Sequence, residues 1–369
     1  MATAIAAKEN DLVKVSYLAM TGYEGAAPGI EIWPAPARYC DPIVARESMA
    51  RTLDRCALAD ELGFDWVSVS EHHYAPYMMT PNPMIMAAAI AQRVRRATIA
   101  LLGPLVPLNN PVRLAEEMAM LDVMTGGRLA ILFLRGTPNE HHTYDTQGDT
   151  RAMTQEGIDL ILKAWLAEEP FAWDGDHYRF STVSVWPRVV QRPHPVVFGS
   201  GNSPESIAFA ASRRLGIAFS FAPLEAIREW IALYRHEAAR HGWQPTPAHI
   251  LYRGLGHVAS TDEQAGAELG AFYSERAAEQ ADIQAQTMGG PPVNSLILEP
   301  YFLGSPETLI RRFEALRDCG VGVVDMVFLG HHALQCGAME LFAVKVLPVV
   351  QSWDDSRFAD AGVVLDSAA

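Results

Sequence analysis

The sequence lacks the features that mark membrane and secreted proteins. It has no stretch of 18 consecutive apolar residues, so no candidate for a membrane-spanning helix. Residues 1–10 include Lys8 and Glu9 but not the apolar core of a secretory signal. The few cysteines are far apart and form neither a C-x-x-C pair nor a disulfide framework: Cys40, Cys56, Cys319 and Cys336. These absences predict a soluble, cytoplasmic protein.

Basic residues are also in the minority. The chain has 29 Lys and Arg against 43 Asp and Glu, a net charge of -14, which disfavours nucleic acid or an anionic membrane as the main partner. A hydrophobic fraction of 49% with 20% charged residues is typical of a soluble globular protein. At 369 residues the chain suits one large α/β barrel, so we expect a single domain over 1–369.

Strand-like and helix-like segments alternate along most of the chain. We expect eight strands, at 14–20, 66–70, 98–102, 129–134, 196–200, 217–221, 250–258 and 323–329. Helices are expected at about 44–62, 83–94, 111–125, 151–167, 223–241, 261–280, 305–319 and 338–346, and another begins at Ser203-Pro204-Glu205. Insertions fall near 21–43, 168–195 and 281–300, and 171–187 reads as a hairpin turning at Asp174-Gly175. This alternation predicts a (β/α)8 TIM barrel with loop insertions.

A doubly wound open sheet is the alternative fold. It would want a G-x-G-x-x-G fingerprint after the first strand, and residues 21–25 read T-G-Y-E-G instead. The barrel is therefore preferred.

The stretch W-V-S-V-S-E-H-H over 66–73 is the most informative for function. A buried strand turns abruptly into Glu71, His72 and His73, and a barrel enzyme carries its chemistry at the carboxyl ends of its strands. The other strand ends should converge on the same face, with Met20, Gly103-Pro104, Arg135-Gly136, Ser200-Gly201 and His331-His332. The plain alternative is that these polar residues only mark strands leaving the core.

Metal binding and a serine nucleophile are both weakly supported at these strand ends. Adjacent histidines on a strand point to opposite faces, so His72 and His73 do not readily share one ion, and there is no H-E-x-x-H. We predict no metal. A nucleophilic serine would want a G-x-S-x-G elbow, which Gly199-Ser200-Gly201 does not complete.

An anion site is better supported. The glycines before Ser203-Pro204-Glu205 leave backbone amides exposed at the start of a helix, which suits a phosphate. Ser305-Pro306-Glu307 repeats the capping pattern, so the triplet alone is a cap; the preceding glycines distinguish the first copy. Arg135 could supply the countercharge, or could simply be a surface arginine.

Four runs, in this order, carry a resemblance to a known family: L-G-F-D-W-V-S-V-S-E-H-H, N-P-V-R-L-A-E-E-M-A-M-L-D-V-M-T-G-G-R-L, L-R-G-T-P-N-E and S-P-E-S-I-A-F-A-A. With F-L-G-S-P-E-T-L-I near the end, the chain resembles the bacterial luciferase-like flavin-dependent monooxygenases from about Val13 to Pro348. The resemblance implies a (β/α)8 barrel that takes reduced FMN from a separate flavin reductase. It also implies oxidation of a small organic substrate with O2 through a flavin C4a-peroxide.

The resemblance assigns roles to the strand ends. His72 inherits the catalytic position beside the flavin, with Glu71 to orient it, and Arg135, Glu205 and Ser206 take the phosphate positions. The remaining cofactor-binding candidates are Met20, Leu102, Gly103, Pro104, Gly136, Ser200, Gly201 and Ser203. The family often has small residues or a non-prolyl cis peptide at the end of strand three, where this chain has Leu102-Gly103-Pro104.

A reactive oxygenated flavin must be shielded from water, which makes 21–41 and 281–292 candidate lids over an apolar cavity. A loop at 137–144 resembles only loosely the members that set a His and a Tyr against the flavin, so His141, His142, His331 and His332 are reserve candidates. The family commonly dimerises through the region of the Met-rich stretches 78–86 and 118–124, so a homodimer is expected. Alternatives are an F420-dependent oxidoreductase of the same superfamily, a metal-dependent barrel hydrolase and a non-enzymatic flavin-binding protein.

Overall fold

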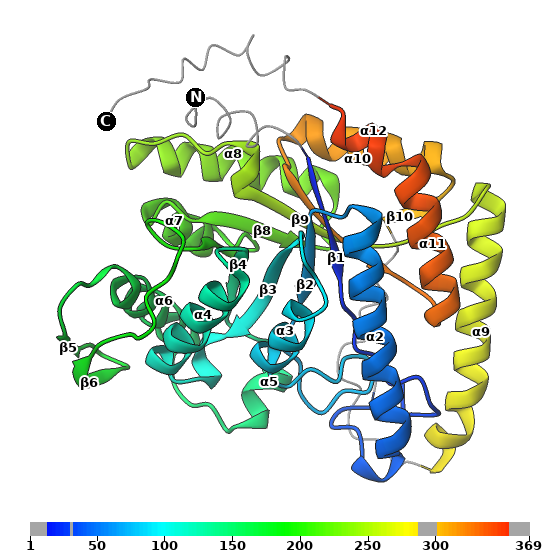
Figure 1. The fold of residues 1–369 in the computed structure, drawn as a ribbon, viewed down its shortest axis with the longest axis horizontal. Helices are drawn as coiled ribbons and strands as arrows, with labels where there is room; N and C mark the ends of the chain where they lie inside the picture. The colour runs from blue at the N-terminus through cyan, green and yellow to red at the C-terminus, as the bar shows by residue number, and fades with distance from the viewer. Residues whose placement is uncertain (1–12, 30–31, 287–300, 354–369) are drawn as a thin grey trace.

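Eight parallel strands close into a barrel in the computed structural model, which describes residues 13–29, 32–286 and 301–353 (Figure 1). Neighbours pair in the order β1-β2-β3-β4-β7-β8-β9-β11, and β11 pairs with β1 to close the ring. The strands are β1 (Lys14–Leu18), β2 (Trp66–Val69), β3 (Thr98–Leu105), β4 (Leu129–Leu134), β7 (Val196–Ser200), β8 (Gly216–Ser220), β9 (Ile250–Val258) and β11 (Val323–Phe328). The predicted fold class is confirmed.

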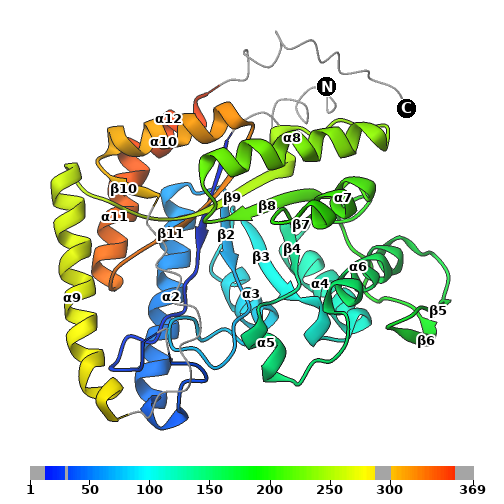
Figure 2. The same ribbon diagram turned by 180° about the vertical axis from the view of Figure 1, so that it is seen from behind.

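Helices surround the barrel, as Figures 1 and 2 show from opposite sides. They are α2 (Pro42–Leu62), α3 (Pro83–Ala91), α4 (Pro111–Thr125), α6 (Thr150–Leu166), α7 (Pro204–Ser212), α8 (Leu224–Arg240), α9 (Asp262–Gln286), α10 (Pro306–Cys319), α11 (His332–Lys345) and α12 (Leu347–Gln351). Short 3-10 turns lie at Ala37–Tyr39, Val106–Leu108 and Pro247–His249. Among the helices found in the described residues, none combines the length and hydropathy of a membrane span.

Helix α4 shows how local sequence sets these boundaries. The Asn110 side chain accepts hydrogen bonds from the amides of Val112 and Arg113, and Pro111 occupies the first turn, where its missing N–H costs nothing. Gly126 ends the helix with a left-handed φ of 67°, a conformation that other residues rarely adopt. The predicted start at Pro111 and the stop at Gly126 are both confirmed.

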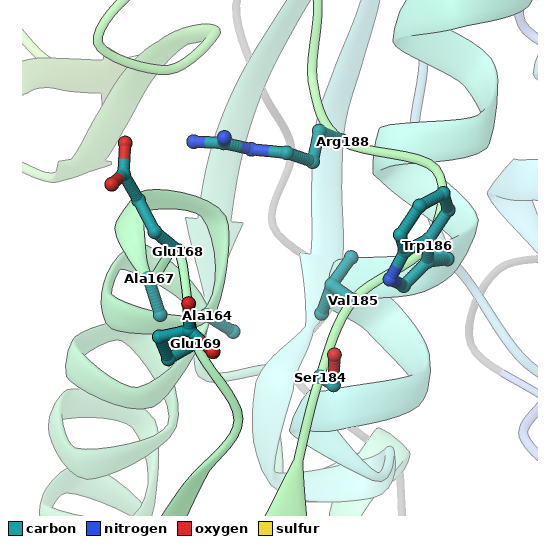
Figure 3. A pocket seen from close by; sticks show the side chains of 8 residues that line it. All are labelled: Ala164, Ala167, Glu168, Glu169, Ser184, Val185, Trp186 and Arg188. Atoms are coloured by element: carbon teal, nitrogen blue, oxygen red, sulfur yellow. The ribbon is translucent and has the colours of Figure 1, made fainter.

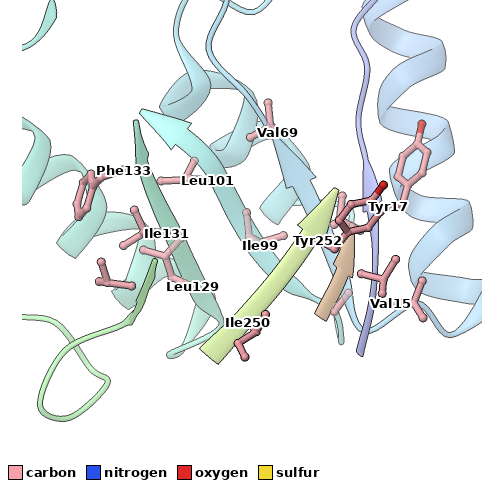
Figure 4. Close-up of a cluster of buried hydrophobic side chains, with 14 of the residues drawn as sticks. Val15, Tyr17, Val69, Ile99, Leu101, Leu129, Ile131, Phe133, Ile250 and Tyr252 are labelled. Carbon is pink, nitrogen blue, oxygen red and sulfur yellow. The ribbon is translucent and has the colours of Figure 1, made fainter. Parts of the chain in front are cut away.

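The barrel strands bury both of their faces, in two separate layers. Side chains that point outward fill the space between strands and helices, including Val15, Tyr17, Ile99, Ile131 and Tyr252 (Figure 4). Those that alternate with them fill the barrel interior: Trp66, Ala100, Leu102, Ala130, Leu132, Phe198, Ala218, Leu251 and Val323. Because the interior is packed, a ligand must sit at the mouth rather than within the barrel.

Four local predictions need correction. Residues 138–143 form a short helix, α5 (Pro138–Thr143), where we expected a loop, and the last long helix starts at His332 instead of Ala338. The predicted interruption at 281–292 is wrong for 281–286, which continue α9; residues 287–292 lie outside the described residues. A short strand missed by the sequence, β10 (Phe302–Gly304), pairs with β9 outside the closed ring.

The predicted hairpin is present. β5 (Phe171–Asp174) and β6 (Arg179–Val183) pair antiparallel and form a small sheet of their own. This sheet lies at the side of the barrel, beyond α6 (Figure 2). The chain therefore leaves the barrel between α6 and β7 without disturbing the mouth.

Candidate active site

His72 lies directly after β2, at the carboxyl ends of the barrel strands. Its amide donates to the Thr80 carbonyl at 3.0 Å, and its side chain remains 28% exposed. The ring Nδ1 is 3.0 Å from Oε1 of Glu140, and the Tyr77 ring lies 5.7 Å away edge-on. Because the carboxylate holds Nδ1, the other ring nitrogen, Nε2, is the one left for a ligand.

Glu140 owes its position to the capping of α5. Its carboxylate accepts hydrogen bonds from the Thr137 amide and hydroxyl, while the Thr137 side chain accepts from the Glu140 amide, which forms a capping box. Burial opposes ionisation of Glu140, but the hydrogen bonds from His72 and Thr137 outweigh it and lower its pKa to about 2. Burial, with a contribution from Glu140, raises the Tyr77 pKa to about 12. His72 and Glu140 therefore form a pair in which an ionised carboxylate holds the imidazole.

Glu71 does not orient His72, contrary to our expectation. Its Oε1 is 3.1 Å from Nε2 of His73, and its Oε2 accepts the amide of Leu105 at 2.9 Å. Glu71 and His73 are both buried. Residues 71 and 73 follow β2 and are two positions apart, and their side chains meet on one side of the chain, away from His72. Glu71 thus ties the end of β2 to the end of β3.

The end of β3 departs from regular strand geometry. The Leu102-Gly103 peptide is cis, and the register of the β3–β4 ladder shifts between Leu102 and Leu105. A Cβ on Gly103 would lie 1.7 Å from the Leu132 carbonyl oxygen, so only glycine fits here. Pro104 is buried beside it. The end of β3 is therefore packed closely against β4 at Gly103.

Three of the predicted cofactor-binding residues, Ser203, Glu205 and Ser206, lie at the start of α7. The Ser203 hydroxyl accepts the Ser206 amide at 3.2 Å and caps the helix. Glu205 is exposed, and its carboxylate pairs with Arg151 at 3.0 Å; a backbone hydrogen bond, Ser203 and Arg151 together lower its pKa. Arg151 also donates to the Ser203 hydroxyl at 3.1 Å. We did not predict Arg151 from the sequence. Its position in the first turn of α6, the long helix after β4, could have indicated it.

Arg135 and Gly136 lie just beyond β4, before α5. Arg135 is exposed, and Gly136 has a left-handed φ of 92°. His141 follows on α5, with both ring nitrogens shielded from solvent and without a hydrogen-bond partner among the described residues. Burial and the nearby Arg135 charge lower the His141 pKa. A buried imidazole without a partner among the described residues, near the exposed Arg135, is a candidate contact for a polar ligand.

The other strand-end candidates have mostly structural surroundings. Ser200 accepts the Asn202 amide, and a Cβ on Gly201 would collide with the Phe219 ring at 2.4 Å. Met20 packs on a small apolar cluster at the mouth that contains Leu18 and Met78. His142 is exposed. His331 and His332 each have a partner of their own. His331 caps α11, and Nδ1 of His332 is 2.9 Å from buried Arg55.

The predicted lid segment 21–41 lies against the loop that carries His72. Four hydrogen bonds join them: Met79 N to Thr21 O, Tyr23 N to Pro76 O, Ala35 N to Tyr74 O and Trp33 Nε1 to His73 O. The Trp33 and Tyr74 rings pack 5.9 Å apart. The described parts of the segment, 21–29 and 32–41, are therefore tied to the loop that follows β2. The second lid candidate is in part helix α9 and in part outside the described residues.

A surface depression and a search for metal ligands give no support to a second site or to a metal centre. A depression of about 60 Å³ lies on the outside of the barrel, between the end of α6 and residues 184–188 (Figure 3). None of the predicted site residues lines it. In the described part of the chain, no group of three or more His, Cys, Asp or Glu side chains is placed to hold a metal.

Comparison with known proteins supports the family resemblance. An uncharacterized protein of Sinorhizobium fredii is 32% identical over 195 residues, which is 52% of this chain and 57% of that protein. The alkanal monooxygenase alpha chain of Photobacterium leiognathi is 28% identical over 53% of this chain and 56% of its own. The oxygenase component of the flavin-dependent trigonelline monooxygenase of Acinetobacter baylyi is 23% identical over 64% and 68%. The match thus spans little more than half of the first two relatives.

Solved structures match over nearly the whole chain. The monooxygenase RslO1 from Streptomyces bottropensis has a TM-score of 0.74 at 25% identity, covering 91% of this chain and 99% of its own. The 3,6-diketocamphane monooxygenase from Pseudomonas putida, in complex with FMN, has a TM-score of 0.71 at 20% identity over 91% and 98%. An F420-dependent secondary alcohol dehydrogenase shares the fold, with a TM-score of 0.70 at 15% identity over 92% and 100%.

A family model described as luciferase-like monooxygenase matches residues 31–322 of the 369-residue chain. That range contains the His72–Glu140 pair, the irregular end of β3 and the start of α7. The protein belongs to the luciferase-like monooxygenase family.

Proposed function

We propose that this protein is the oxygenase of a two-component, FMN-dependent monooxygenase. It would take reduced FMN from a separate flavin reductase and use O2 to oxidise a small organic substrate. Membership of the family supports this, and so does the relative from Acinetobacter baylyi, whose name includes both flavin dependence and an oxygenase component. The observation that carries the proposal is the imidazole of His72, backed by an ionised carboxylate at the barrel mouth.

The residues present fit a flavin mononucleotide. Arg151, Ser203 and Ser206 supply cationic and hydroxyl donors at the start of α7, the kind of set that holds a phosphate, and the exposed Arg135 follows the neighbouring strand β4. The ring nitrogens of His141, which lies near Arg135 on α5 and has no hydrogen-bond partner among the described residues, also call for a polar partner. Glu205 is the one anion in the group, and its pairing with Arg151 offsets its charge.

The ring would lie against the end of β3. Gly103 has no side chain, so it would meet a planar group with main chain alone. Bound reduced FMN would supply the electrons that activate O2. The role of His72 is to hold or give a proton at Nε2 while Glu140 fixes Nδ1 and the ring orientation. Segment 21–41 would keep water from the site.

Two properties of the whole protein are part of the proposal. Exposed apolar side chains lie on the neighbouring helices α2, α3 and α4, and they support a homodimer through this surface: Ile43, Met49, Ile85, Met120, Val123 and Met124. Light scattering should then give twice the chain mass. All four cysteines are free, which suits the reducing cytoplasm.

Binding and oxygen consumption test the function. Purified protein should bind reduced FMN and, with a flavin reductase and NADH, couple O2 consumption to oxidation of members of an aldehyde, ketone and aromatic panel. Because an F420-dependent enzyme shares the fold, F420 should be titrated in parallel. Tight binding of F420 with no binding of FMN would transfer the protein to the deazaflavin-dependent oxidoreductases. Binding of FMN without turnover of any substrate would favour a non-enzymatic flavin protein.

A further inference from the structure

A buried ion pair lies inside the barrel, above the apolar interior layer. Arg253 on β9 and Asp325 on β11 are in register, and Nε of the arginine donates to Oδ2 of the aspartate at 2.7 Å. Asp325 is fully buried and Arg253 is 7% exposed. The other carboxylate oxygen accepts the Ser68 hydroxyl at 2.7 Å. Burying such a pair costs more desolvation free energy than an apolar pair would, so stability alone does not account for it.

The free end of Arg253 reaches across the barrel to β3. Its Nη2 donates to the Leu102 carbonyl at 2.9 Å, and its Nη1 lies 3.4 Å from the Ser70 hydroxyl. Ser70 donates to the same carbonyl at 2.6 Å. Two side-chain donors thus converge on one main-chain oxygen, at the point where the β3–β4 register shifts. A buried carbonyl at such a break needs partners from elsewhere, and these donors supply them.

We propose that Arg253 is a positioning residue for the flavin. Asp325 holds the guanidinium by Nε, and the terminal nitrogens hold the Leu102 carbonyl, which orients the backbone of 102–104 that receives the flavin ring. The inference rests on the proposed function, and it assigns Arg253 no contact with substrate or flavin. A planar guanidinium can bind a carboxylate on one edge and a carbonyl on the other, whereas lysine has a single point of attachment.

Arg128, which directly precedes β4, offers a matched control. Arg128 donates from Nε to the Thr125 carbonyl at 3.1 Å, and from its terminal nitrogens to the carbonyls of Ala97 and Val94. The Ala97 carbonyl directly precedes β3, at the opposite end of that strand from the barrel mouth. Replacing Arg128 therefore removes the same kind of contact without touching the mouth.

The experiment compares Arg253→Met, Arg253→Lys and Arg128→Met. Each variant is titrated with FMN and with riboflavin, the visible spectrum of the bound oxidised flavin is recorded, and a thermal melt is taken. Arg253→Met should weaken both flavins equally, by about tenfold, the scale of one lost charge-assisted hydrogen bond, and should alter the spectrum. Arg253→Lys should recover part of both effects. Arg128→Met should change only the melting temperature.

The results distinguish failure of the Arg253 proposal from failure of the proposed function. Wild-type affinity and spectrum in Arg253→Met would overturn the proposal while leaving the function intact, and so would equal flavin effects in Arg128→Met. If Arg253→Met does not fold, Arg253→Lys decides, because an unchanged riboflavin affinity and spectrum in that variant refute positioning. Failure of the wild-type protein to bind any flavin would overturn both this inference and the proposed function.

Discussion

The replacement of His72 by alanine is the most direct test of the site. In the proposed mechanism Nε2 of His72 carries the proton, so His72→Ala should lower substrate oxidation by roughly 10² to 10⁴, the range for a lost general acid or base. Flavin affinity should remain near that of the wild type, because the phosphate donors and the end of β3 are separate from this ring. Unproductive release of hydrogen peroxide should rise in proportion.

The stability change should be small for this variant. His72 is 28% exposed and makes one side-chain hydrogen bond, to Glu140, which keeps its two contacts from Thr137 when the imidazole is removed. The loss should therefore be about 1 kcal/mol in the free energy of unfolding. His73→Ala is the matched control. It takes away a buried donor from the Glu71 carboxylate, so it should cost about 1 to 3 kcal/mol.

The assay is oxygen consumption and peroxide release with a substrate that the wild type oxidises, alongside thermal melts of both variants. His72→Ala should be stable and uncoupled, whereas His73→Ala should be coupled and less stable. If His72→Ala oxidises substrate at the wild-type rate and His73→Ala does not, the roles of the two histidines are reversed. If neither variant changes the rate, the E-H-H stretch is structural, and His141 becomes the next catalytic candidate.

Two further predictions concern the cofactor and the pH dependence. Arg135→Ala should weaken FMN by about 1.5 to 3 kcal/mol and leave riboflavin nearly unchanged in parallel titrations, since the lost contact is to phosphate; equal losses would assign Arg135 to the fold or the ring. Glu140 has a folded pKa of about 2 against its ordinary 4.5, so its contribution to stability is present above about pH 4.5 and is lost as the pH falls towards 2. The difference in melting temperature between wild type and Glu140→Gln should shrink over that window; a difference that stays constant would contradict the depressed pKa.

Local sequence determined the elements of this protein. The capped start and glycine stop of α4 are short-range signals, and the change from apolar β-branched residues to Glu71 marked the end of β2 before any fold was assumed. Alternating apolar strands and helices then led to the barrel, because helices on one face of a closed parallel sheet leave few other arrangements. A capping box, Thr137-Pro138-Asn139-Glu140, was also present in the sequence and would have found α5.

The partners of the site residues depended on the tertiary structure. His72 and Glu140 are 68 residues apart, and Arg253 reaches a carbonyl 151 residues away. Proximity in the sequence suggested that Glu71 serves His72, but Glu71 contacts His73, and the capping of α5 brought Glu140 to His72 instead. Spacing along a chain reports which side chains share a face of one element. Closure of the barrel decides which elements meet, and it brings the residues of this site together.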